Sequence, residues 1–249
     1  MARERDLLIC AVQFLTRLPT PRLAGFQPDW VSRSARYFPL VGQLVGLICA
    51  VVFWAASQVW QGVLPALLAI AAGVLVTGAF HEDGLADAAD GLGGGGDPTR
   101  RLEIMKDSRI GVYGALALGL ALSLKVAALA VVPPASGALA LIVYHGCARG
   151  AAVLAMTSLP YVGDRDAAKR KPAPIGVTRG EAALALALAA WPLLIAPPAF
   201  VLGVLGGAAL ALTLAWMVRR LIGGCTGDVL GAIEQVFEVG FLLAVSAAL

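Results

Sequence analysis

Long apolar segments separated by short polar ones form the main pattern of this 249-residue chain. A helix needs about 20 apolar residues to cross a bilayer, where unpaired backbone groups are not tolerated. The pattern predicts about seven such helices, near residues 38–60, 63–81, 111–132, 137–157, 181–197, 199–218 and 229–248. The fifth is the least regular, because Trp191-Pro192 and Pro197-Pro198 interrupt it. We therefore expect an all-α, polytopic integral membrane bundle that forms a single domain over residues 1–249.

The composition supports a membrane protein and argues against a soluble one. Hydrophobic residues make up 59% and charged residues 14% of the chain, whereas soluble domains have about 45–50% apolar and about 25% charged residues. The four cysteines lie far apart without metal-ligand spacing, so they are interpreted as small apolar residues. The lipid bilayer is the expected environment, no nucleic-acid partner is expected, and a homo-oligomer is left open.

The basic residues predict the orientation. Of the 19 Lys and Arg residues, 17 precede the first predicted helix or follow the second, fourth or sixth. Since cytoplasmic loops are enriched in Lys and Arg, the N-terminus is expected in the cytoplasm and the C-terminus outside. Residues 1–36, including an interfacial amphipathic helix, and the loops 82–110 and 158–180 then face the cytoplasm. The basic stretch 165–176 would recruit a polyanionic substrate or contact lipid headgroups.

The stretch HEDGLADAADG, residues 81–91, concentrates acidic residues beside an apolar helix. If the second predicted helix continues through it, Asp83, Asp87 and Asp90 share one face, with Glu82 about 100° away. These like charges would repel one another, and the C-terminal dipole of that helix would disfavour them. A divalent cation would reverse both effects, and Mg²⁺ prefers carboxylate oxygens. The hypothesis is a metal site that handles phosphate; the alternative is a solvated acidic turn whose aspartates cap neighbouring elements.

Residues next to this stretch offer further candidate chemistry. His81 is either a base or a hydrogen-bonded bystander. In RRLEIMKDSRIGVYG, residues 100–114, Lys106 and Arg109 would place cations near a diphosphate, and Asp107 would add an acidic ligand. The alternative is that these cations only anchor the start of the third predicted helix at the membrane surface.

Ionisable residues also occur inside the predicted membrane helices. Arg149 lies in the middle of the fourth, where an arginine costs about 2.5–3.5 kcal/mol on insertion, so it should face the bundle interior. Its partner is then a substrate phosphate or an internal carboxylate. Lys125, Glu234 and Glu238 are expected to form a buried ion pair that fixes packing.

The stretch GGCTGDVLGA, residues 223–232, places a further acid at the start of the last predicted helix. By the predicted topology, Asp228 reaches the same membrane face as Asp83 and Asp87 and supplies a second acidic wall. The competing interpretation is a helix N-cap formed by Thr226 or by Asp228 itself.

Several of these stretches together resemble one family along nearly the whole chain. They are FLTRLPTP (14–21), ARYFPLVGQLVG (35–46), HEDGLADAADG (81–91), IMKDSRIGVYG (104–114), ARG (148–150) and GGCTGDVLGA (223–232). In this order they resemble the cobalamin synthase family, the adenosylcobinamide-GDP ribazoletransferases. The resemblance implies a Mg²⁺-dependent transferase of cobalamin biosynthesis. It would move the cobinamide phosphate of adenosylcobinamide-GDP to α-ribazole, or to α-ribazole 5′-phosphate, and release GMP.

The resemblance also implies roles for the candidate residues. The expected Mg²⁺ ligands are Glu82, Asp83, Asp87, Asp90 and Asp228. Lys106, Arg109 and Arg149 would bind the substrate phosphates. Asp107 is a candidate additional acid of the site. Asp83, Asp87 or His81 would take the proton of the attacking hydroxyl. Rival interpretations are a membrane phosphotransferase of the CDP-alcohol kind, an aspartate-rich prenyltransferase and a transporter. In the first rival, the arginine expected after DGxxA is replaced here by Asp87.

Overall fold

The computed structural model describes residues 4–27, 29–163 and 175–249, and it is helical throughout apart from loops and one isolated bridge between Tyr161 and Cys225. In chain order the elements are α1 (Glu4–Leu15), α2 (Asp29–Ser34), the 3-10 helix η1 (Ala35–Tyr37), α3 (Phe38–Ser57), α4 (Val63–Thr77), α5 (Phe80–Gly94), α6 (Pro98–Met105), α7 (Val112–Ala130), α8 (Pro134–Ser158), α10 (Arg179–Ala190), the 3-10 helix η2 (Trp191–Leu194), α11 (Ala199–Leu221) and α12 (Gly227–Ala248). The predicted all-α class is confirmed.

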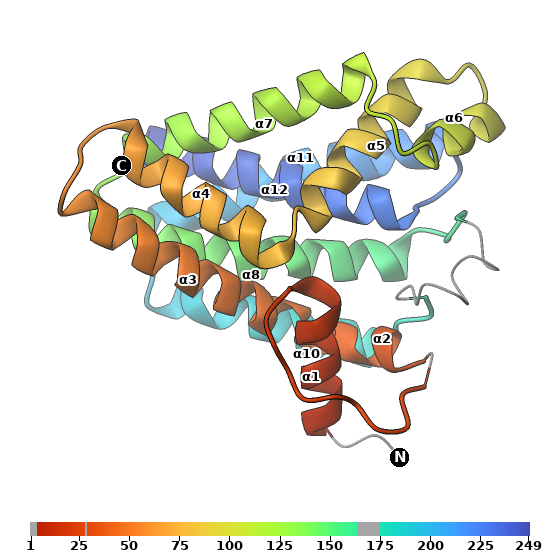
Figure 1. Cartoon of the computed structure of the whole chain (residues 1–249), viewed down its shortest axis with the longest axis horizontal. Coiled ribbons are helices and arrows are strands. Elements are labelled where there is room, and N and C mark those ends of the chain that lie inside the picture. The colour runs from red at the N-terminus through yellow and green to blue at the C-terminus, as the bar shows by residue number, and fades with distance from the viewer. Residues whose placement is uncertain (1–3, 28, 164–174) are drawn as a thin grey trace.

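The long helices α3, α4, α7, α8, α11 and α12 run roughly along the long axis of the molecule, while α1 lies across them (Figure 1). Helix α12 occupies the centre of the bundle, where it contacts α5, α7, α8 and α11. Helix α3 packs along α8 on the other side of the core. Because α12 carries two glutamates into this centre, its position determines where polar side chains meet inside the bundle.

The number of helices that can span a membrane is smaller than predicted. Among the described residues, five helices are long and apolar enough: the continuous unit 29–57, α7, α8, α11 and α12. The bent pair α4 and α5 makes a sixth if both helices belong to one span. The predicted span 181–197 is wrong, because α10 has only 12 residues before the chain tightens into η2 at Trp191-Pro192. Proline cannot supply the backbone N–H that a continuing helix needs.

The second predicted span also ends earlier than expected. Helix α4 stops at Thr77, where Gly78 has φ +70° and Ala79 has φ +60°, both in the left-handed region. Left-handed residues end a helix because they turn the backbone out of its path. Helix α5 then starts at Phe80 in a new direction, bent by 90° from α4. The prediction of one continuous helix from residue 63 into the acidic stretch is therefore wrong.

The N-terminal segment forms a helix, as predicted. Ala11 and Leu15 of α1 are buried with Phe38 of α3 and Ala185 of α10 in a small apolar core. On another side of α1, Gln13 is exposed. Its apolar face is thus used against the bundle, and its location at a membrane interface stays a prediction.

Candidate functional site: an acidic face and a buried charge cluster on α5

Helix α5 carries the acidic stretch, and its actual start changes the electrostatics. The residues from Phe80 to Gly94 are helical, so the predicted i, i+4, i+7 arrangement of Asp83, Asp87 and Asp90 is confirmed. Glu82 and Asp83, however, occupy the first turn of a new helix. The dipole at a helix N-terminus stabilises anions. The expectation that the helix dipole disfavours the acids is therefore wrong for Glu82 and Asp83.

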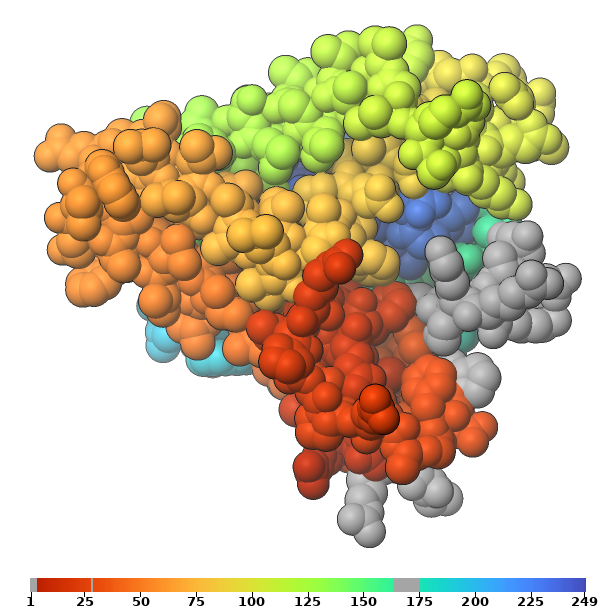
Figure 2. Space-filling view, viewed as in Figure 1, coloured from red at the N-terminus to blue at the C-terminus, as the bar shows by residue number. Residues whose placement is uncertain are grey.

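Two glycines allow α5 to pack closely on α12. A Cβ added to Gly84 would lie 2.8 Å from the Asp228 carbonyl oxygen, and one added to Gly231 would lie 3.3 Å from the His81 Cα. Neither position has room for a larger side chain without a shift of the backbone. The contact brings Asp228, at the start of α12, beside the turn of α5 that carries Asp83 and Asp87. Figure 2 shows the first part of α12 at the surface next to α5.

Asp83, Asp87 and Asp228 form what we call the acidic face. Asp83 is exposed, whereas Asp87 and Asp228 are half-buried. The charged neighbours that act on the Asp87 carboxylate are themselves carboxylates, those of Asp83, Asp228 and Asp90. Within the part of the chain that the structure describes, the carboxylates of Asp83 and Asp87 accept no hydrogen bond. The acidic face therefore concentrates negative charge without a described cation to balance it.

The N-cap interpretation of the α12 start is confirmed for Thr226. Its Oγ1 accepts a hydrogen bond from the Val229 backbone N–H at 3.3 Å. The same hydroxyl donates to Asp228 Oδ2 at 3.3 Å. Thr226 therefore performs the capping, and the Asp228 carboxylate still contributes its charge to the acidic face.

Asp90 has a different environment from the other aspartates of α5. It is buried, and its two oxygens accept the backbone N–H groups of Gly111 at 2.7 Å and Gly114 at 2.8 Å. These donors belong to the first turn of α7, whose orphan N–H groups need acceptors. Asp90 thus fastens the start of α7 to α5, and with it the preceding loop that carries Lys106, Asp107 and Arg109.

The loop between α6 and α7, which carries Lys106, Asp107 and Arg109, is exposed at Arg109. The Arg109 side chain binds the Asp107 carboxylate through two nitrogens, with Nη2 to Oδ2 at 2.6 Å and Nε to Oδ1 at 3.0 Å. The Arg109 guanidinium lowers the pKa of Asp107 to about 2, so this carboxylate is charged throughout the physiological range. An exposed pair of this kind contributes little to stability. Arg109 therefore has a partner that a substrate phosphate would have to replace.

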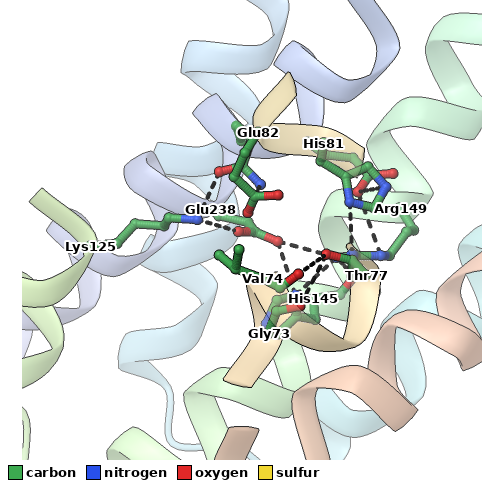
Figure 3. Close-up of polar contacts among 11 residues, drawn as sticks. Gly73, Val74, Thr77, His81, Glu82, Lys125, His145, Arg149 and Glu238 are labelled. Carbon is green, nitrogen blue, oxygen red and sulfur yellow. Dashed lines mark hydrogen bonds and ion pairs between the residues drawn. The ribbon is translucent and has the colours of Figure 1, made fainter. Parts of the chain in front are cut away.

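The side chains of His81 and Glu82 lie among polar side chains of the bundle interior, including Arg149 and Glu238 (Figure 3). His81 Nε2 lies 3.0 Å from Glu234 Oε2, and its Nδ1 lies 3.4 Å from Arg149 Nη2. Glu82 Oε1 accepts a hydrogen bond from Gln235 Nε2 at 3.2 Å. Both residues are at most 8% exposed. Within the described chain, both ring nitrogens of His81 are already directed at charged neighbours.

These residues belong to what we call the buried charge cluster. Its members are His81, Glu82, Lys125, His145, Arg149, Glu234, Gln235 and Glu238, all of them buried. At its centre Glu238 lies 3.0 Å from Lys125 Nζ, 3.1 Å from Arg149 Nη1 and 3.0 Å from His145 Nδ1. The predicted pairing of Lys125 with a glutamate of the last helix is confirmed for Glu238.

Arg149 finds internal carboxylates, as one of its two predicted interpretations requires. Arg149 contacts Glu238, and its Nε also lies 3.5 Å from Glu234 Oε2. The residue is 1% exposed. The structure places it inside the buried charge cluster and not at the acidic face. Its contacts therefore favour the internal carboxylate over a substrate phosphate.

Gln235 and Tyr144 are polar residues of the interior that the sequence analysis did not single out. Gln235 accepts from Lys125 Nζ at 2.7 Å and donates to Glu82, so it links two parts of the buried charge cluster. The sequence contained a signal for Gln235, because it is a polar residue between Glu234 and Glu238 in a mainly apolar helix. Tyr144 is fully buried, and its hydroxyl has no hydrogen-bond partner among the described residues.

The five predicted metal ligands do not form one site. Asp83, Asp87 and Asp228 line the acidic face, Glu82 lies in the buried charge cluster, and Asp90 binds the start of α7. Within residues 4–27, 29–163 and 175–249, no group of three His, Cys, Asp or Glu side chains is placed to hold a metal ion by itself. Most of the predicted basic loop 165–176 lies outside the described residues.

Fold and site together define a multi-pass helical membrane protein with an acidic surface at one end of its bundle. Comparison with known proteins identifies the family. The sequence profile of CobS, cobalamin-5-phosphate synthase, matches residues 7–246. The adenosylcobinamide-GDP ribazoletransferase of Leptothrix cholodnii is 44% identical over 98% of this chain and 96% of its own length. That of Shewanella frigidimarina is 45% identical over 98% and 95%. No solved structure matches. The chain belongs to the cobalamin-5-phosphate synthase family, which confirms the predicted resemblance.

Proposed function

We propose that this chain is an adenosylcobinamide-GDP ribazoletransferase of cobalamin biosynthesis whose reaction takes place at the acidic face. The family membership supports the activity. In that reaction the P–O bond between the cobinamide phosphate and GMP breaks. A new P–O bond forms to the ribose hydroxyl of α-ribazole or of its 5′-phosphate. The observation that supports the location is the charge of Asp83, Asp87 and Asp228, which no described cation neutralises.

Magnesium is the proposed cofactor, and the chemistry of the donors fits it. Mg²⁺ takes carboxylate oxygens and is commonly held by one or two of them together with substrate phosphates. Asp83 and Asp87 would hold the ion, and Asp228 would complete the acidic surroundings. Because two carboxylates suffice when a diphosphate supplies the other ligands, a preformed group of three is not required. Bound Mg²⁺ would neutralise the negative charge that develops on the transferred phosphoryl group.

The remaining side chains have the following proposed roles. A carboxylate of the acidic face, Asp83 or Asp87, accepts the proton of the attacking hydroxyl. His81 is less suited to this task, because its two nitrogens face Glu234 and Arg149. Lys106 and Arg109 bind the phosphate of the leaving GMP. Arg109 would exchange its Asp107 partner for that phosphate, which is an exchange between two exposed contacts.

The proposed location of this site is the cytoplasmic side of the bacterial inner membrane. Its support is the distribution of Lys and Arg, since the basic segments on α6 and at the end of α11 lie at the same end of the bundle as the acidic face (Figure 1). Nucleotide substrates are soluble cytoplasmic molecules, which agrees with an acidic face that opens there.

The test is a GMP-release assay on purified protein with adenosylcobinamide-GDP and α-ribazole, with and without Mg²⁺. Asp83→Asn and Asp87→Asn should each lower the Mg²⁺-dependent rate about 100-fold or more, while the protein still inserts and folds. Glu103→Gln is the matched control, because Glu103 is an exposed acid of α6 paired with Arg100. Turnover retained in both aspartate variants would contradict the assignment of the acidic face.

A further inference from the structure

An apolar cavity of the bundle shares no lining residue with the acidic face or the buried charge cluster. It is a groove of about 400 Å³ between α8, α10 with η2, α11 and α12. Ala151 and Ala155 of α8 form one wall, Ala208 and Ala215 of α11 form another, and Phe237 of α12 lies at its base. The lining is almost entirely apolar, so the groove fits a hydrocarbon ligand.

The groove exists because α10 is too short to cover the neighbouring long helices. Helix α10 ends at Ala190, and η2 is held against α3 by the Trp191 Nε1 hydrogen bond to Gln43 Oε1 at 3.0 Å. Helices α8 and α11 continue past it, and both are long and apolar enough to span a bilayer. Their small residues leave the space between them unfilled. When both helices cross the bilayer, as their length and composition allow, the groove between them lies at the level of the lipid hydrocarbon.

One end of the groove is polar. Five residues of α11 line it at helical spacing: Val204, Ala208, Ala211, Leu212 and Ala215. Arg219 follows Ala215 by four residues and so lies next on the same side of the helix. Ser158, the last residue of α8, also lines the groove. The ends of the two helices meet, because Cys225 N–H donates to Pro160 O at 2.8 Å and Val162 N–H donates to Cys225 O at 2.9 Å. Arg219 and Ser158 thus belong to the same end.

Arg220, the residue after Arg219, contacts a tryptophan. The guanidinium carbon of Arg220 lies 5.7 Å from the ring centroid of Trp216. Arg220 therefore stacks on an exposed tryptophan, of the kind found at membrane interfaces. Arg220 follows Arg219 by one residue, so its side chain leaves the helix about 100° further round than that of Arg219. Arg219 is the cation that continues the groove, at the level where lipid phosphates lie.

The geometry points to a phospholipid site: one acyl chain lies in the groove between α8 and α11, and the lipid phosphate binds Arg219. The charge complementarity between an arginine and a phosphate identifies the ligand as a phospholipid and not an uncharged hydrocarbon. The site is separate from the acidic face, so it stands independently of the proposed reaction.

Two matched pairs of variants on α11 test the site. Ala208→Phe fills the groove, whereas Ala209→Phe adds the same ring to an exposed position outside it. Arg219→Gln removes the phosphate partner, whereas Arg220→Gln removes the arginine that stacks on Trp216. Protein is purified in a mild detergent from vesicles of phosphatidylglycerol and phosphatidylethanolamine. Retained phospholipid is counted by native mass spectrometry, and size-exclusion chromatography checks each variant for folding.

The expected result is that the unaltered protein, Ala209→Phe and Arg220→Gln each retain one phospholipid. Ala208→Phe should lose it, and Arg219→Gln should bind it about tenfold more weakly, the effect of one lost charge-assisted contact. Arg219 is exposed, so this variant remains informative if Ala208→Phe fails to fold. Equal retention by all variants would overturn the proposal. So would a dimer of the unaltered protein that Ala208→Phe converts to a monomer, since the occupant would then be a second copy of the chain.

Discussion

The acidic face and the buried charge cluster start from neighbouring residues of one helix and differ in how their charge is balanced. Glu82 points into the cluster, where Gln235 binds it, and Asp83 points out to the acidic face. In the cluster, the single carboxylate of Glu238 contacts Lys125, Arg149 and His145. At the acidic face, the described charged groups that act on Asp87 are other carboxylates. The cluster places internal cations beside its carboxylates, whereas the described part of the chain places no cation beside those of the acidic face.

The difference predicts opposite responses to the same chemical change. Replacing a carboxylate by its amide inside the cluster leaves the buried cations with one carboxylate fewer, and such changes cost several kcal/mol. The same replacement at the acidic face removes repulsion between like charges and costs nothing in stability. Stability and activity should therefore respond differently in the two regions. Variants of the cluster should lower the free energy of unfolding, and variants of the acidic face should lower only the reaction rate.

The largest expected effect is that of Glu238→Gln. The substitution leaves Lys125 and Arg149 buried with one carboxylate fewer, and we expect a loss of about 3–5 kcal/mol in the free energy of unfolding. The measurement is chemical unfolding in detergent micelles. Glu103→Gln, at an exposed position, should change stability by less than about 0.5 kcal/mol.

A partial rescue sharpens this prediction. Lys125→Met combined with Glu238→Gln removes a cation and an anion together, so the double variant should be more stable than the sum of the single effects implies. If Glu238→Gln unfolds like the unaltered protein, the cluster does not stabilise the bundle in the way that its contacts suggest.

Gly84→Ala should have the next largest effect, because it tests the contact that places Asp228 beside α5. The new methyl group would lie 2.8 Å from the Asp228 carbonyl oxygen, so the two helices must move apart, at a cost of about 1–3 kcal/mol. Activity should fall with stability, since the acidic face opens. The control is Gly119→Ala on α7, where an added Cβ meets nothing within 4 Å. An equal effect of both substitutions would show that close packing at Gly84 is unimportant.

Asp90→Asn should have a smaller effect on stability and a distinct effect on kinetics. An amide keeps one acceptor oxygen, so one N–H of Gly111 or Gly114 loses its partner, at a cost of about 1–2 kcal/mol. Since the start of α7 positions the loop with Lys106 and Arg109, KM for adenosylcobinamide-GDP should rise more than kcat falls. A loss confined to kcat would instead support the role of metal ligand that the family resemblance implies for Asp90.

The sequence was most informative where one helix was considered alone. The spacing of Asp83, Asp87 and Asp90 predicts a shared face, and the position of Glu82 about 100° away explains why it enters the interior. Charged residues in apolar helices must find partners, which predicted the environment of Lys125 and left two alternatives for Arg149, a substrate phosphate or an internal carboxylate. The break at Gly78 and Ala79 was not predictable in the same way, because alanine rarely adopts a positive φ. Asp90 was misleading, since its role depends on α7, which approaches from 21 residues further along the chain.

The smallest expected effect is that of Asp87→Asn on stability without divalent cations, and its sign distinguishes the two regions. Removing one of several like charges should stabilise the protein by about 0.2–0.5 kcal/mol, whereas any amide substitution in the buried charge cluster destabilises it. Added Mg²⁺, at ionic strength held constant with NaCl, should raise the Tm of the unaltered protein and not that of a combined Asp83→Asn and Asp87→Asn variant, because only the former binds the ion. The measurement is thermal unfolding in detergent micelles, and it needs no substrate. An equal rise in both proteins would place the bound ion outside the acidic face, and the crowding of carboxylates there would then have a cause other than metal binding.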